Sequence, residues 1–116
     1  MIEKSAPLRS DKHRRLVAFI PCHECGLEGQ SQAAHANYSK GMGIKACDSQ
    51  IFPMCHACHQ WLDQGGELTR EERRNYERRA VDGTRRLLRA LGKWISEVEE
   101  AFQRADKYKG EVCEHN

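Results

Sequence analysis

Hydrophobic positions in the first half of the chain form short runs and show no extended helical period. Leu16 to Ile20 form a β-prone apolar run that stops at Pro21, and this pattern predicts a strand leading into a tight turn. Residues 26–50 are mostly polar and include Gly29, Gly41 and Gly43. For this stretch we expect a loop with short strands around 33–36 and 50–54.

A short helix is predicted after the second of two cysteine-containing turns. The sequence HQWLDQ begins at His59, and Gly65 and Gly66 follow it. Two glycines at this point are typical of a helix that ends.

The second half of the chain has the pattern of an amphipathic helix. Thr69 and Glu72 fit a capping box, which predicts a helix start. Apolar residues then recur at steps of three and four, which places them on one face as far as about residue 105: Tyr76, Ala80, Leu87, Leu91, Trp94, Val98 and Phe102. Gly83 and Gly92 could each break this helix, so one kinked helix and two packed helices are equally consistent with the pattern.

Composition indicates a small core that needs additional stabilisation. The chain has 116 residues, of which 39% are hydrophobic and 31% are charged. Six cysteines and six histidines are many for this length, and their clustering favours a metal site over a disulfide framework. The N-terminal region has no apolar signal segment, and no apolar run is long enough to span a membrane. We therefore expect a soluble, cytoplasmic protein.

Four cysteines form the most specific pattern in the sequence. Two CxxC turns, separated by 29 residues, can present four thiolates to one tetrahedral zinc ion through Cys22, Cys25, Cys55 and Cys58. A redox pair or two disulfides are the alternatives, but paired CxxC turns without a βαβ pattern disfavour them. His23 and His56 lie inside the turns and could each replace a thiolate, whereas Cys47 and Cys113 are expected to be bystanders.

A second set of polar residues has the composition of a metal-assisted hydrolase site. His59 and Asp63 are four residues apart on the predicted short helix, so their side chains share a face and could chelate one ion. An imidazole and a carboxylate suit Mg²⁺, Mn²⁺ or Zn²⁺ with positions left for water and phosphate. His35, on the preceding hairpin, could take a proton from an attacking water.

These residues resemble the HNH (ββα-metal) endonuclease motif. The order is Ala34–His35, Asp48, then PMCHACH at 53–59 and Asp63, with CHEC and GMGIK at the expected places. This combination is similar to prophage-borne HNH families related to the phage recombination-enhancement nuclease, over roughly residues 8–68. The resemblance implies an α+β fold, in which a small zinc-stabilised, treble-clef-like ββα-metal module precedes a helical segment.

The resemblance also implies a role for each residue. His35 would be the general base, Asp48 would stand in place of the motif's Asn and orient it, and His59 with Asp63 would hold a catalytic Mg²⁺ or Mn²⁺. Lys45 and the backbone of 41–43 would contact a phosphate. Many HNH enzymes have a metal ligand immediately before the base, where this chain has Ala34. The ion would then have two protein ligands and more waters, or His35 would itself be a ligand.

Basic residues are concentrated in two zones. Residues 1–15 carry five Lys or Arg against two acids, and residues 70–93 carry nine against four, although the net charge is only +2. If the second zone is one helix, four arginines project to one side and could bind the DNA backbone: Arg74, Arg78, Arg85 and Arg89. A helix that packs on a second copy or on a recombination or replication protein is nearly as consistent with this pattern.

The sequence therefore predicts a nuclease module at 1–68 with a basic N-terminal arm, a basic helical extension at 69–108, and a flexible tail at 109–116. The predicted function is metal-dependent DNA cleavage in a bacterial or phage-infected cell, in phage DNA recombination or processing. The alternative is a zinc-stabilised adaptor that binds nucleic acid or protein through a degenerate HNH site.

Overall fold

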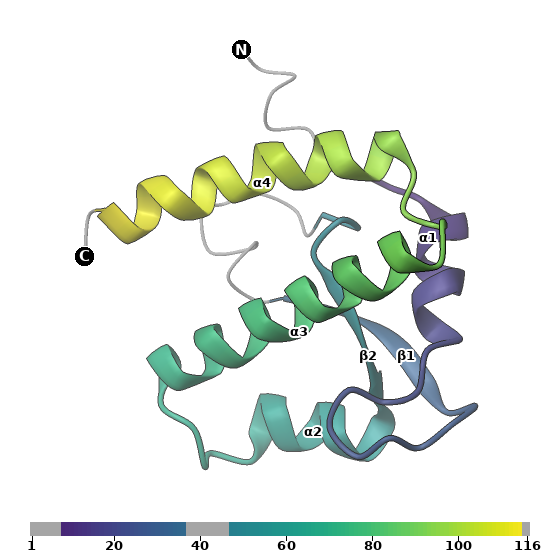
Figure 1. Cartoon of the computed structure of the whole chain (residues 1–116). Helices are drawn as coiled ribbons and strands as arrows, with labels where there is room; N and C mark the ends of the chain where they lie inside the picture. Colours follow the sequence, from purple (N-terminus) through teal and green to yellow (C-terminus); the bar gives the residue numbers. More distant parts are fainter. Residues whose placement is uncertain (1–7, 37–46, 115–116) are drawn as a thin grey trace.

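A computed structural model describes residues 8–36 and 47–114, with side chains described up to residue 105. In this part of the chain the structure is α+β, with two strands and four helices (Figure 1). The sequence prediction of a small α+β protein is confirmed at this level. The arm before residue 8, Lys45 and the 41–43 loop lie outside the described residues.

The strands form the predicted hairpin. β1 (Ser31–His35) pairs antiparallel with β2 (Ile51–Cys55), in a register that places Ser31 opposite Cys55 and His35 opposite Ile51. All five residues of β2 are buried, because helices cover it in addition to the pairing with β1. The carbonyl of Pro53 points away from β1 and accepts a hydrogen bond from the His23 N–H at 2.8 Å. The nitrogen and the carbonyl of one strand residue point to the same side, so the missing N–H of Pro53 removes no hydrogen bond to β1.

The first helix corrects the predicted strand at Leu16 to Ile20. The structure has α1 (Asp11–Ala18) here, with Ser10 as its N-cap. His13 and Val17, four residues apart, are buried, whereas Phe19 is 84% exposed. A short apolar run does not distinguish a strand from the last turn of a helix, and the polar residues 10–15 supply the preceding turns.

Helix α2 (His56–Gln64) follows β2 without a gap and ends at Gly65, as predicted. The ββα order of the module therefore places the end of the hairpin directly beside the start of this helix. In Figure 1, α2 lies at the Cys55 end of β2 and α3 (Arg70–Ala90) crosses in front of the hairpin.

The helical extension consists of two helices, α3 and α4 (Ser96–Glu114). The capping box of Thr69 and Glu72 is present at the start of α3. Gly83 lies inside α3 without breaking it, whereas Gly92 adopts φ +73°, a conformation that favours glycine and ends the helix. α4 continues past residue 105, where the apolar period stops.

The apolar face predicted for α3 is wrong at Leu87 and Leu91, which are 40% and 57% exposed. The buried residues of α3 are instead Glu77, Ala80, Val81, Thr84 and Leu88. The prediction assumed one continuous helix phase from Tyr76 to Phe102. Because the helix is interrupted at Gly92, the helical periodicity of α4 does not continue that of α3. The apolar residues of the two helices therefore do not form one continuous face.

None of the helices in the described ranges is both long and apolar enough to cross a membrane.

Candidate functional site

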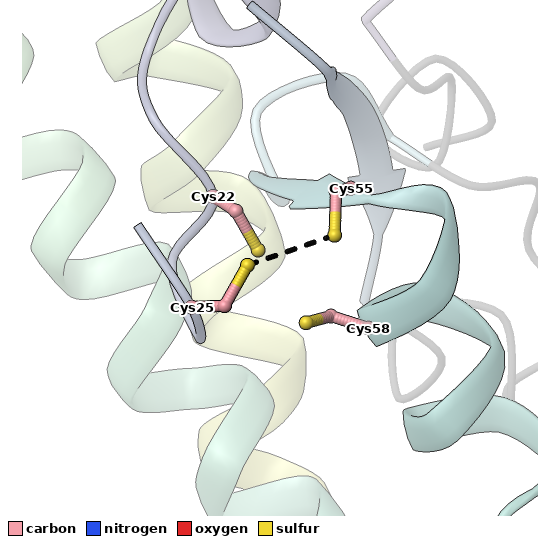
Figure 2. A group of neighbouring side chains, drawn as sticks. All are labelled: Cys22, Cys25, Cys55 and Cys58. Atoms are coloured by element: carbon pink, nitrogen blue, oxygen red, sulfur yellow. Dashed lines mark hydrogen bonds between the residues drawn. The ribbon is translucent and has the colours of Figure 1, made fainter. Parts of the chain in front are cut away.

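The four predicted cysteines form one cluster, to which the turn at 22–25, the end of β2 and the first turn of α2 contribute (Figure 2). All four are free thiols, and their sulfur atoms lie within 4.8 Å of one another. The Cys25 and Cys55 sulfurs are 3.8 Å apart. A tetrahedral zinc ion with bonds of about 2.3 Å requires sulfurs about 3.8 Å apart. The cluster therefore fits a structural zinc ion.

The charges in the cluster also favour a cation. Burial tends to raise the pKa of the Cys22 thiol, but hydrogen bonds from the backbone N–H groups of Cys25, Cys55 and Glu24 lower it to about 6. Burial and the neighbouring cysteines raise the pKa of Cys58 well above its usual range. Four thiolates repel one another at this distance, so a bound cation is what allows all four to ionise.

The cluster holds several elements of the fold together. Tyr76 of α3 donates a hydrogen bond to Glu24 at 2.7 Å, and its ring packs edge-on against His23. Cys22 and Cys55 belong to the main hydrophobic core with Phe52. A metal at this point would thus fix the turn, the hairpin and α3 relative to one another.

His35 and Asp48 are in direct contact, although they are 13 residues apart. His35 Nε2 lies 2.8 Å from Asp48 Oδ1. The Asp48 side chain is fully buried, and the His35 side chain is 25% exposed at the end of β1. The imidazole is thus held from the inside by a carboxylate and is open to solvent on its outer side.

Two residues that the sequence analysis did not single out also hold Asp48. The Ser10 backbone N–H donates to Asp48 Oδ2 at 2.6 Å, and Arg14 Nη1 donates to the same oxygen at 2.5 Å. Burial acts to raise the pKa of Asp48, but these contacts, together with His35, outweigh it and lower the pKa below its ordinary value. Asp48 is therefore an ionised carboxylate. The sequence analysis placed Arg14 only in the basic zone 1–15, because no local pattern links it to Asp48, 34 residues away.

His59 and Asp63 share one face of α2, as their spacing predicts. His59 Nε2 lies 3.2 Å from Asp63 Oδ2, and both side chains are partly exposed. His59 Nδ1 is 3.5 Å from the side-chain oxygen of Gln32 on β1. The other oxygen of Asp63 accepts a hydrogen bond from Arg73 of α3. Gln32 and Arg73 are further residues that sequence patterns did not indicate.

The predicted catalytic residues do not all meet at one point. Within the described ranges, the four cysteines are the only group of three or more potential ligands close enough to share an ion. His59 and Asp63 thus form a pair, and His35 is not gathered with them. The two arrangements left open by Ala34 stay predictions.

The four arginines predicted to contact DNA differ in their surroundings. Arg85 forms a bidentate pair with Glu99 of α4, at 3.1 and 2.8 Å, and lies over the Phe102 ring. Its guanidinium is therefore engaged between the two helices. Arg74 and Arg78 are half-buried, and Arg89 is exposed.

Comparison of the chain with protein-family models, with curated proteins and with solved structures finds no match.

Proposed function

We propose that the protein is a metal-dependent DNA endonuclease of the HNH type, built on a zinc-stabilised, treble-clef-like ββα-metal module. One observation carries the proposal. A partly exposed histidine at the end of β1 is held by a fully buried, ionised aspartate, on the hairpin that leads into the helix carrying His59 and Asp63.

The contact between His35 and Asp48 favours one tautomer of the neutral imidazole. An ionised carboxylate can only accept hydrogen bonds, so His35 Nε2 carries a hydrogen and donates it to Asp48. The lone pair is then on Nδ1, the nitrogen that does not face Asp48. His35 can take a proton from water through Nδ1, and Asp48 stabilises the imidazolium that forms. Arg14 and Ser10 keep Asp48 ionised and in place for this role.

The pair on α2 fits a divalent cation. His59 Nε2 faces the Asp63 carboxylate at 3.2 Å, and its Nδ1 faces the side-chain amide of Gln32 at 3.5 Å. In the tautomer with the hydrogen on Nδ1, the Nε2 lone pair and the carboxylate oxygen can share one cation. Adjacent ligands of an octahedral ion with bonds of about 2.1 Å are about 3.0 Å apart, and those of a tetrahedral zinc about 3.3 Å.

We propose that His59 and Asp63 hold one divalent ion, which is Mg²⁺, Mn²⁺ or Zn²⁺. When bound, such an ion would supply positive charge to a non-bridging phosphate oxygen and to the leaving 3′-oxygen. Water, deprotonated by His35, would add to phosphorus as the P–O3′ bond breaks and the 3′-oxygen takes up a proton, which leaves 5′-phosphate and 3′-hydroxyl ends. The exposed arginines of α3, such as Arg89, are suited to contact the DNA backbone. The proposed setting is phage or prophage DNA recombination or processing.

A nicking assay with a matched histidine control tests the proposal. Zinc-loaded protein is incubated with supercoiled plasmid in Mg²⁺, in Mn²⁺ or in EDTA. We expect nicking with either ion and none in EDTA, and we expect His59→Ala to abolish it. His56→Ala is the control, since His56 is an exposed histidine on the same helix.

The opposite result would favour the adaptor function. If folded, zinc-loaded protein binds DNA but does not cut plasmid, single-stranded or branched substrates with any of these ions, the nuclease proposal is wrong. Arg73, which occupies one oxygen of Asp63, would then be a sign of a degenerate site.

A further inference from the structure

Arg73 lies behind the His59–Asp63 pair and connects it to α3. Its Nη2 donates to Asp63 Oδ1, and its Nη1 is 3.5 Å from the backbone carbonyl oxygen of Asp63. Its Nε donates to Glu77 at 3.3 Å. The Arg73 side chain is 22% exposed and Glu77 is buried, so the guanidinium is held firmly at this position.

This contact divides the two oxygens of Asp63 between different partners. Oδ1 belongs to Arg73, and Oδ2 faces His59. The carboxylate can therefore offer one oxygen to an ion while the other stays hydrogen-bonded, which is how neighbouring residues commonly orient a metal ligand. A bidentate metal contact would require Arg73 to leave.

The charge of Arg73 has a second effect. The Arg73 guanidinium balances the charge of the Asp63 carboxylate that it contacts, while its Nε side contacts the buried carboxyl of Glu77. A divalent cation at the pair would meet the guanidinium across a single carboxylate, and this repulsion weakens the attraction that Asp63 alone would exert on the ion. A phosphodiester would supply the missing negative charge, as substrate phosphates do in many Mg²⁺ sites.

We infer that Arg73 is a positioning residue that orients Asp63 and, by its charge, prevents the His59–Asp63 pair from retaining a divalent ion unless a DNA phosphate is bound. This inference rests on the proposed function of the pair. It assigns to Arg73 the coupling of metal binding to substrate binding.

Mn²⁺ binding to the zinc-loaded protein tests the inference, with free Mn²⁺ measured by electron paramagnetic resonance. The double variant Arg73→Gln/Glu77→Gln is compared with the single variant Glu77→Gln. Both proteins lack the buried Glu77 carboxylate, so removing Arg73 does not leave that carboxylate without its ion pair. In the absence of DNA we expect the double variant to bind Mn²⁺ roughly tenfold more tightly, from Coulomb's law in a water-like dielectric. The gain should disappear when His59→Ala is added.

Two further variants separate charge from shape. Arg73→Lys keeps the charge and loses the planar fork, so it should bind Mn²⁺ as weakly as the wild type. Arg70→Gln removes an exposed charge one turn away on the same helix and should change the affinity little. The effect of DNA is measured in a His35→Ala background, which prevents cleavage. Adding a short DNA duplex should increase the amount of protein-bound Mn²⁺, and this increase should disappear when His59→Ala is added.

Several results would overturn the inference. The first is an Mn²⁺ affinity of Arg73→Gln/Glu77→Gln that is equal to or weaker than that of Glu77→Gln, including undetectable binding in both proteins. The second is an Arg73→Lys variant that binds Mn²⁺ more tightly than the wild type. The third is an amount of bound Mn²⁺ that does not change when DNA is added. If these occur while plasmid nicking still depends on His59, the nuclease proposal stands and the role of Arg73 falls. If the Mn²⁺ affinities change as expected but no DNA is cut, the nuclease proposal falls instead.

Discussion

Removal of the metal from the cysteine cluster should unfold the protein. Structural zinc in small domains contributes about 10–16 kcal/mol near neutral pH, whereas native domains are stable by only about 5–15 kcal/mol. In this chain Cys22 and Cys55 are 3% and 5% exposed and belong to the main core cluster. Loss of the ion would leave four close thiols at the edge of that core, two of them buried, so the free energy of unfolding should fall to about zero or below.

The assay compares a cluster cysteine with a buried cysteine outside the cluster. Cys58→Ser should lose the bound zinc and the cooperative thermal transition seen by circular dichroism. Cys47 is also buried, but its sulfur accepts from the Leu8 N–H and contacts Ser49. Because a hydroxyl can make the same contacts, Cys47→Ser should keep the zinc and cost about 1 kcal/mol. The reasoning is refuted if zinc-free protein, or Cys58→Ser, melts at the wild-type temperature.

Three further predictions test the helical extension. Leu88→Ala should cost about 2–5 kcal/mol in urea unfolding and the neighbouring Leu87→Ala well under 1, because only Leu88 is fully buried; equal costs would contradict the assigned face. Contacts led by the Arg85 guanidinium lower the pKa of Glu99 to about 2, so its stabilising contribution is complete above about pH 4.5 and is lost as the pH falls toward 2. Glu99→Gln should flatten the acid side of the melting temperature against pH, and an unchanged profile would exclude this contact. Arg74→Gln should weaken DNA binding and reduce its salt dependence by about one phosphate contact, whereas Arg85→Gln should mainly lower thermal stability; the reverse pattern would show that Arg85 contacts DNA.

Features that depend on neighbouring residues could be predicted from the sequence. Three features each act within one turn of chain: the Cys-to-Cys spacing inside each CxxC turn, the glycines after α2, and the capping box of Thr69 and Glu72. The structure has all three. The contact of His59 with Asp63 follows in the same way from their positions four residues apart on one helix.

Features that depend on tertiary packing could not be predicted. Residues 16–20 are compatible with a strand, and the helix is favoured because Val17 packs on Ile51 and Leu88, which come from distant elements. Arg14 reaches Asp48 over 34 residues, and Arg73 reaches Asp63 over 10. No local pattern identifies such partners, and the resemblance to HNH motifs contains no position for them.

The most direct test of the central claim is the plasmid-nicking rate of His35→Ala beside that of the wild type, at equal zinc content and in saturating Mg²⁺. If His35 takes the proton from the attacking water, the rate should fall by about 10²–10⁴-fold without a change in melting temperature. A His35→Ala protein that nicks plasmid as fast as the wild type would contradict the proposed chemistry of this site.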